Sequence, residues 1–370
     1  MRTTLPYKPE SIDTFKKQLL VWSQQFHEVV WLDSNRYNQR YSSFDAVMAV
    51  DAITSIQTDF YEAFNKLKEY QTITKDWLFG YLSYELKNAV EDLKSENYDG
   101  LKFPELYFFQ PKKLFLFKDD TVEIQYLNMV ADEWEDDLEA IKNISDCLIP
   151  LDAVESNKTI KIEPRLQKDE YLCKVNKMLE LIHRGDIYEA NFCQEFYAEN
   201  TRIQPLESYQ KLNNISKPPF ATYLKIGDKY VLSASPERYL KKIGTKIISQ
   251  PIKGTAKRST DTEEDNRLKE ALSVDEKERN ENIMIVDLVR NDLSKTATKG
   301  SVKVEELCQV YTFPQVHQMI STIISKINIL EHPVHVIEST FPMGSMTGAP
   351  KISAMKIIED LEVTKRGVYS

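Results

Sequence analysis

Residues 220–249 carry the pattern that most restricts the fold of this chain. Three apolar runs follow one another here, separated by the pairs Gly227-Asp228 and Gly244-Thr245. Apolar runs joined by short glycine turns are typical of antiparallel strands connected by hairpins. The pattern therefore predicts an antiparallel meander in this part of the chain.

Helical patterns surround the meander. Residues 171–182 carry apolar side chains at helical spacing. Ser273 and Glu276 have the spacing of a capping box, which predicts a helix that runs to about Asp292. A last helix is expected directly after Pro350. Helices mixed with antiparallel strands favour an α+β fold over a doubly wound parallel sheet.

The most polar stretch that could act as a boundary, residues 152–161, follows Pro150 and predicts a division into two regions. Before it, residues 79–84 indicate a strand in a less regular part of the sequence. We therefore expect an N-terminal region of residues 1–155 and a second region of residues 162–370.

Composition argues against several functional classes. The net charge of −9, with no basic stripe, argues against a nucleic-acid partner. No apolar run approaches the length of a membrane span, and the first residues lack a signal-peptide core. The four cysteines lie far apart without a C-x-x-C pair, which is typical of reduced core residues in a cytoplasmic protein.

Glu278 and Glu281 lie three residues apart, on one face of the helix expected after Ser273. A pair of this kind is usually a solvated surface. Here residues 283–286 are strongly apolar, so at least one carboxylate can border the core. Carboxylates with open coordination positions suit Mg²⁺ beside an anionic substrate.

Lys253 lies in an apparent tight turn between Pro251 and Gly254, after a half-buried strand. A turn lysine is usually solvated, so the residue alone is only a candidate for chemistry. Glu237 follows a strand end, where an ordinary turn residue is an equally good interpretation. In a partly dry cleft its pKa would rise and it could act as a proton donor.

His317 has mostly apolar neighbours in the sequence, a setting in which a hydrogen-bonded core histidine is more common than a catalyst. Gly344 and Ser345 belong to a loop, residues 341–351, that leads into the last predicted helix. Free backbone N–H groups at a helix start attract anions such as carboxylates, although an ordinary glycine-rich loop has the same pattern.

Six motifs, in this order, resemble those of the chorismate-utilising enzymes, a family that includes anthranilate, aminodeoxychorismate, isochorismate and salicylate synthases. The resemblance implies two large antiparallel β-sheets packed as a sandwich with helices on the outside. The motifs are GDIYEAN (185–191), SASPER (233–238), PIKGT (251–255), ENIMIVDLVRNDL (281–293), VH (316–317) and the loop of residues 344–351.

The PIKGT motif is typical of the aminodeoxychorismate synthases, whereas anthranilate synthases usually carry alanine in place of Lys253. The resemblance thus implies formation of 4-amino-4-deoxychorismate from chorismate and ammonia. It implies that Lys253 attacks the ring at C2, that Glu237 protonates the departing C4 hydroxyl, and that His317 is an active-site residue.

The resemblance also implies ligand sites and a partner. Mg²⁺ would bind Glu281, with Glu278 beside it. Ammonia would come from a separate glutamine amidotransferase subunit, because the chain has no G-x-C-x-G turn. Substrate contacts are expected at Gly254, Thr255, Gly344 and Ser345. A tryptophan pocket, whether regulatory, structural or empty, is expected at Ser34, Tyr41, Ser42, Ser43, Phe44, Pro219, Phe220 and Ala221.

The family's pattern continues beyond Ser370 with strands that supply a tyrosine, an arginine and a second glutamate for Mg²⁺. We therefore expect the natural protein to continue past this residue. Two alternatives remain open. One is another chorismate enzyme, first of all an anthranilate synthase. The other is a non-catalytic subunit that binds a ligand in an inactive pocket.

Overall fold

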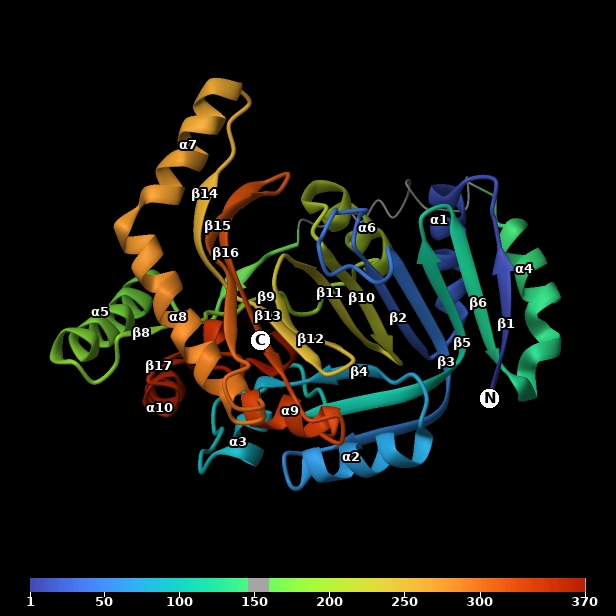
Figure 1. Ribbon diagram of the computed structural model, residues 1–370. Helices are drawn as coiled ribbons and strands as arrows, with labels where there is room; N and C mark the ends of the chain where they lie inside the picture. Colours follow the sequence, from blue (N-terminus) through green and yellow to red (C-terminus); the bar gives the residue numbers. More distant parts are fainter. Residues whose placement is uncertain (146–159, 370) are drawn as a thin grey trace.

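A computed structural model describes residues 1–145 and 160–369 (Figure 1). Its strands form two large antiparallel sheets, of eight and five strands. The larger sheet contains β1 (Arg2–Tyr7), β2 (Glu28–Asp33), β3 (Ala46–Thr58), β4 (Phe79–Leu82), β5 (Leu106–Lys118), β6 (Thr121–Leu127), β10 (Phe220–Ile226) and β11 (Lys229–Ser235). The smaller sheet contains β12 (Arg238–Ile243), β13 (Lys246–Gln250), β14 (Ile252–Lys257), β15 (Lys303–Thr312) and β16 (Val316–Lys326).

Strands adjacent in space are often distant in sequence. The larger sheet has the order β1-β6-β5-β3-β2-β10-β11, with β4 also paired to β5. The smaller sheet has the order β12-β13-β16-β14, with β15 also paired to β16. Two short antiparallel pairs complete the strands: β7 (Glu163–Pro164) with β9 (Phe196–Tyr197), and β8 (Glu189–Ala190) with β17 (Gly348–Ala349).

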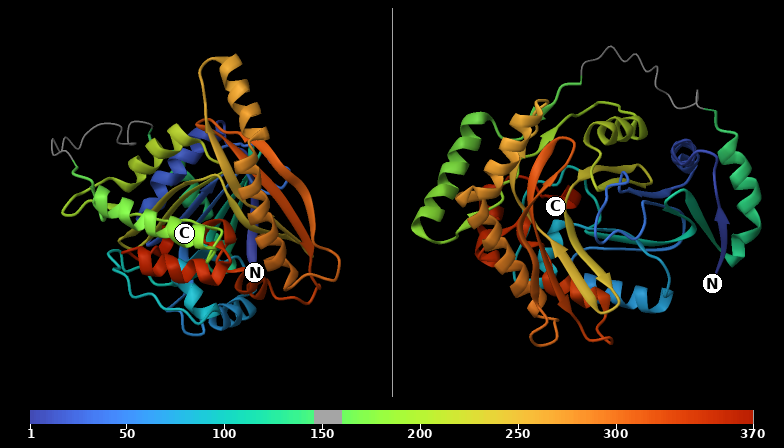
Figure 2. Two further views of the ribbon diagram at one scale, coloured as in Figure 1. Left: turned by 90° about the vertical axis from the view of Figure 1, so that its left-hand side faces the viewer. Right: turned by 45° about the horizontal axis from the view of Figure 1, so that its top comes forward.

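Helices lie around the two sheets, as Figures 1 and 2 show, and the predicted α+β fold is confirmed. The helices are α1 (Ile12–Trp22), α2 (Ala63–Thr74), α3 (Lys87–Val90), α4 (Trp134–Lys142), α5 (Lys168–Arg184), α6 (Pro205–Ser216), α7 (Thr262–Val274), α8 (Glu276–Ser294), α9 (Pro333–Thr340) and α10 (Lys351–Leu361).

Each sheet buries one face under helices. On the larger sheet, Trp31 and Phe117 pack in one buried cluster with Phe15 of α1 and Leu138 of α4. On the smaller sheet, a second cluster joins strands β13 and β16 to one side of α8. Burial of this apolar surface stabilises each layer, and it fixes α8 against the strands that carry the candidate site.

The two predicted regions share one sheet. β10, from the second region, pairs with β2, from the first, between Ala221–Asp33 and Ile226–Glu28. The polar stretch at 152–161 falls almost entirely outside the described residues. The division into residues 1–155 and 162–370 therefore stays a prediction about sequence regions.

The apolar runs of residues 220–249 form two hairpins in different sheets, so the prediction of a single meander is wrong. The turn at Gly227-Asp228 joins β10 to β11 in the larger sheet, and the turn at Gly244-Thr245 joins β12 to β13 in the smaller one. Pro236 lies between the hairpins, where it has no N–H to continue a ladder. Glu237 consequently lies where the chain crosses from one sheet to the other.

The predicted helix after Ser273 is present, but its cap differs. Helix α8 starts at Glu276, and the Asp275 side chain caps it by accepting a hydrogen bond from Glu278 N at 3.0 Å. Ser273 instead lies in the last turn of α7, where its hydroxyl donates to the Glu270 carbonyl. Aspartate and serine cap equally well, so the sequence pattern did not choose between them.

Two expectations from composition have structural counterparts. None of the described helices is long and apolar enough to cross a lipid bilayer. Of the cysteines in the described part, only Cys308 is buried, whereas Cys193 is half-buried and Cys173 exposed. The expectation of core cysteines is therefore wrong for Cys173, and Cys147 lies outside the described residues.

A buried ion pair between α1 and β2 offers a test of this packing. Lys16 Nζ lies 3.1 Å from Asp33 Oδ1, and both side chains are buried. The substitution Lys16→Met would leave the Asp33 charge unpaired, so we expect a loss of about 3–5 kcal/mol in the free energy of unfolding, measured by urea denaturation. The matched control Arg36→Met breaks the exposed pair with Asp13 and should cost about 0–1 kcal/mol. Equal losses in the two variants would contradict this account.

Candidate active site

Lys253 lies on a β-bulge in β14, which corrects the predicted tight turn. β14 pairs with β16 at Ile252–Ile320 and again at Thr255–Gln318, so β14 has one extra residue between these pairs. Gly254 occupies the bulge with φ +95°, a conformation that favours glycine. A Cβ there would lie 3.2 Å from Glu278 Oε2. The bulge therefore brings Gly254, and with it the neighbouring Lys253, close to Glu278 in the first turn of α8.

Asn282 of α8 holds the bulge in place. Its Nδ2 donates to the carbonyls of Lys253 at 3.2 Å and Met319 at 3.1 Å, and its Oδ1 accepts from Ser321 Oγ at 2.5 Å. The side chain is fully buried. A buried amide with its hydrogen bonds satisfied fixes the backbone that carries the Lys253 side chain.

The amine of Lys253 faces two side chains of the GDIYEAN motif. Nζ donates to Asn191 Oδ1 at 3.0 Å and lies 3.9 Å from Glu189 Oε1. The Lys253 side chain is only 18% exposed. The lysine thus points into a polar, largely enclosed site instead of towards solvent.

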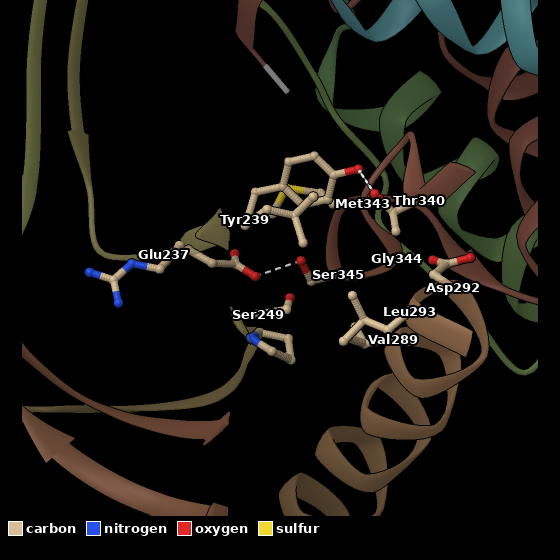
Figure 3. A pocket seen from close by; sticks show the side chains of 13 residues that line it. Glu237, Tyr239, Ser249, Val289, Asp292, Leu293, Thr340, Met343, Gly344 and Ser345 are labelled. Carbon is tan, nitrogen blue, oxygen red and sulfur yellow. Dashed lines mark hydrogen bonds between the residues drawn. The ribbon is translucent and has the colours of Figure 1, made fainter. Parts of the chain in front are cut away.

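Glu237, at the crossing between the sheets, accepts two hydrogen bonds, and Figure 3 shows the one from Ser345. Its Oε1 accepts from Ser345 Oγ at 2.5 Å and from Ile252 N at 3.3 Å. Burial raises the pKa of Glu237, although these hydrogen bonds and the Lys253 charge oppose the shift. A carboxyl group with a raised pKa suits a proton donor near neutral pH.

Asn191 connects the lysine to the glutamate. Its Nδ2 donates to the Ser345 carbonyl, while the Ser345 hydroxyl donates to Glu237. Ser345 lies in a short 3₁₀ turn, Gly344–Met346, where a Cβ on Gly344 would come within 2.5 Å of Leu288 of α8. The structure therefore brings together Lys253, Glu237, Gly344 and Ser345, with Gly254 and Thr255 adjoining the lysine.

A small cavity lies behind the bond between Glu237 and Ser345, and Figure 3 shows its lining. Val289 and Leu293 of α8 form part of its wall, and Ser249 of β13 adds a hydroxyl group. Glu237 lines this cavity together with these groups.

His317 is placed away from this network. Its Nδ1 lies 3.0 Å from Thr312 Oγ1, and its Nε2 lies 3.0 Å from Asp265 Oδ1. Asp265 also accepts a hydrogen bond from Arg258, and this bond holds its pKa well below the usual range. The histidine is fully buried with both ring nitrogens engaged. This geometry favours the core interpretation, and an active-site role stays a prediction.

Glu278 and Glu281 present two partly exposed carboxylates beside the bulge, 26% and 37% exposed. Lys277 lies 3.7 Å and 3.5 Å from them. Within residues 1–145 and 160–369, no three metal-binding side chains are clustered. Two hard oxygen donors nevertheless fit part of a Mg²⁺ shell, the rest of which can come from substrate and water. The fit is partial, and the metal stays a prediction.

The residues predicted to form a tryptophan pocket do not all face one space. Pro219 and Phe220 line a cavity together with residues 37–40 and Phe313. Ala221 instead packs in the buried cluster under α1. The cavity is therefore a groove between the two sheets that contains only two of the predicted residues.

The remaining predicted pocket residues hold the loop after β2 in place. Tyr41 OH bonds to Glu305, and Lys246 Nζ donates to the same hydroxyl at 2.6 Å. Ser42 donates to the Phe44 carbonyl, and Ser43 accepts a hydrogen bond from Lys241. The Phe44 ring packs against Trp77, and Ser34, directly after β2, is buried. Whether any of them contacts tryptophan stays a prediction.

Four residues of the site were not singled out from the sequence: Glu189, Asn191, Asn282 and Arg366. The first three lie inside the GDIYEAN and ENIMIVDLVRNDL motifs. There, a polar residue between apolar neighbours was the available sign of a buried polar side chain. Arg366 carried no signal. Its guanidinium donates to the carbonyls of Asn191 at 2.7 Å and Met346 at 2.6 Å, and it pairs with Glu362.

The fold and the sequence together assign the chain to a family of chorismate binding enzymes. The sequence profile described as chorismate binding enzyme matches residues 27–370, and the chain belongs to this family. A crystal structure of anthranilate synthase component I from Streptococcus pneumoniae has the same fold, with a TM-score of 0.76 and 22% identity, over 90% of this chain and 82% of that one.

Two sequence relatives differ in their named activities. Aminodeoxychorismate synthase component 1 of Escherichia coli is 38% identical over 207 residues, which are 56% of this chain and 46% of the relative. Anthranilate synthase component 1 of Saccharolobus solfataricus is 32% identical over 305 residues, which are 82% of this chain and 69% of the relative. The chain thus spans less than half the length of the first of these relatives.

The raised pKa of Glu237 predicts a pH effect on stability. Between the ordinary value of 4.5 and the raised folded value, the folded state holds more protons than the unfolded state, so stability falls as pH rises through this window. Glu237→Gln removes this dependence. We expect the stability of the variant to improve relative to wild type between mildly acidic and neutral pH, as measured by urea denaturation. The control Glu180→Gln, at an exposed position of α5, should show no such trend, and a Glu237→Gln curve parallel to wild type would refute the prediction.

Proposed function

We propose that the protein forms 4-amino-4-deoxychorismate from chorismate and ammonia. The observation that carries the proposal is the network in which Asn191 and Ser345 join Lys253 to the half-buried Glu237. It supplies an amine nucleophile and a carboxylic acid at a single enclosed site. The similarity to aminodeoxychorismate synthase component 1 supports the same reaction.

In the proposed first step, neutral Lys253 forms a bond from Nζ to C2 of the ring. Both double bonds of the ring shift by one position and the C4–O bond breaks. Glu237 donates its proton to the departing hydroxyl, which leaves as water. The step requires the neutral amine of Lys253 and the protonated form of Glu237, and burial favours that form of the glutamate because it raises its pKa.

In the second step, ammonia attacks C4 while the C2–N bond breaks, and the electron pair of that bond stays on Lys253. The Ser345 hydroxyl and the backbone around Gly254, Thr255 and Gly344 would orient the substrate. Glu281, with Glu278 beside it, would hold Mg²⁺, which when bound would neutralise a substrate carboxylate.

Anthranilate synthesis is the second candidate, because the relative in Saccharolobus solfataricus is named for it and matches more of this chain. A lysine at position 253 supports the first candidate, since it provides the nucleophile for a covalent step at C2.

The name component 1 supports a partner chain, which we propose to be a glutamine amidotransferase that supplies ammonia. A cytoplasmic location is part of the same proposal.

The product decides between the two candidates. We expect the full natural chain, given chorismate, Mg²⁺ and ammonium, to form aminodeoxychorismate, which an added lyase converts to 4-aminobenzoate. Chromatography of the mixture without lyase checks for the alternative. Direct appearance of anthranilate would overturn the proposal, and lack of any turnover, even with the glutaminase present, alongside tight ligand binding would favour the non-catalytic alternative.

The nucleophile is tested by Lys253→Ala, which should abolish aminodeoxychorismate formation or divert it to anthranilate. Lys257→Ala removes an exposed lysine from the same strand and is the matched control. Unchanged kinetics in Lys253→Ala would refute the role of the lysine.

Glu237→Gln should lower kcat by about 10²–10⁴, the usual contribution of a general acid.

The metal site is tested by Mg²⁺ titration calorimetry in the presence of chorismate. Glu281→Gln removes a charged hard ligand, so we expect Mg²⁺ binding to weaken by about tenfold or more. The same change at Glu276, an exposed residue at the start of α8, is the control. Equal Mg²⁺ affinity in wild type and Glu281→Gln would exclude the proposed ligand.

A further inference from the structure

Glu189 has no role in the proposed first step, yet its carboxylate is directed at the lysine. It lies on β8, which pairs with β17 at Ala349. Its Oε1 is buried and, among the described residues, has no hydrogen-bond partner. Lys253 Nζ is 3.9 Å away, too far for a hydrogen bond. A buried acceptor without a donor is costly, so the position is adapted to a donor that arrives with the reaction.

The backbone around Glu189 is rigid. The Glu189 carbonyl approaches the Cα of Gly348 so closely that a Cβ on Gly348 would lie 2.3 Å from it. The neighbouring Tyr188 N donates to the Ala349 carbonyl at 2.7 Å. The backbone of Glu189 is thus held close to the loop that carries Ser345.

Asn191 places a second acceptor on the same side. Residues two apart in an extended segment point the same way, so Glu189 and Asn191 both face Lys253. A side-chain carbonyl oxygen has two lone pairs, and Lys253 occupies one of them on Asn191 Oδ1. Two oxygen acceptors therefore converge beside the amine that leaves C2 in the second step.

We propose that Glu189 and Asn191 form the binding site for the ammonia nucleophile, an inference that rests on the proposed function. Ammonia donates one N–H to Glu189 Oε1 and one to Asn191 Oδ1, and these bonds leave its lone pair free to attack C4. The new C4–N bond forms as the C2–N bond to Lys253 breaks. The product amine leaves as an ammonium group, Lys253 is neutral again, and Glu237 regains from solvent the proton it gave to water.

The two steps can be measured separately. Chorismate without ammonium should produce a covalent adduct on Lys253, detected by intact-protein mass spectrometry, and added ammonium should discharge it. In Glu189→Ala we expect the adduct to form at the wild-type rate and its discharge by ammonium to slow about 10–100-fold, the loss of one hydrogen bond to a charged group. In steady state, the KM for ammonium should rise by a similar factor while the KM for chorismate stays within about twofold.

Glu189→Gln keeps an oxygen acceptor without the charge and should lie between Glu189→Ala and wild type. The control Glu180→Gln, exposed on α5, should behave as wild type in both steps. Unchanged discharge in Glu189→Ala would overturn the proposal, as would equal losses in adduct formation and discharge, which would assign Glu189 to the lysine instead. Failure of the wild-type chain to form an adduct or product would refute the proposed function itself, and it is thereby distinguished from failure of the Glu189 site.

Discussion

The side-chain amide of Asn191 accepts a hydrogen bond from Lys253 and donates one to the Ser345 carbonyl, and the geometry of the site depends on these two bonds. Through Asn191 they connect β14 of the smaller sheet to the turn of residues 344–346, which also contacts α8. Arg366 supports the same connection, because it donates to the backbone carbonyls of Asn191 and of Met346 in the loop that carries Ser345. Ile252 N also donates to Glu237, so the strand of Lys253 is joined to the Ser345–Glu237 pair through its backbone as well as through the lysine side chain.

The proposed reaction uses two groups of the site in their uncharged forms. Glu237 is half-buried at a strand crossing, where loss of hydration favours the protonated acid. Lys253 has a polar neighbour in Asn191, which accepts a hydrogen bond from the amine without requiring it to be charged. Fixed positions for both groups lower the entropy cost of reaction, since neither has to be brought in from solvent.

Much of the fold could be predicted from the sequence, because periodicity and turn residues are local signals. The hairpins of residues 220–249 were correctly located, but their division between two sheets depends on Pro236 and on contacts from distant strands. The candidate site was identified through motifs, and Lys253, Glu237 and Ser345 do meet. The bulge at Gly254 could not be predicted, since it depends on pairing with β16 and on Asn282. His317 shows the same limit, because its partner Asp265 lies on a separate helix.

The pairing of β2 with β10 has a consequence for the order of folding. β2 is made early in synthesis, but the strand that covers its edge follows only after α6 has emerged. Closing so long a loop is entropically costly and slows folding of sheets with distant partners. During synthesis the edge of β2 is an open template for other strands, so the nascent chain needs protection from aggregation until Ile226 has left the ribosome.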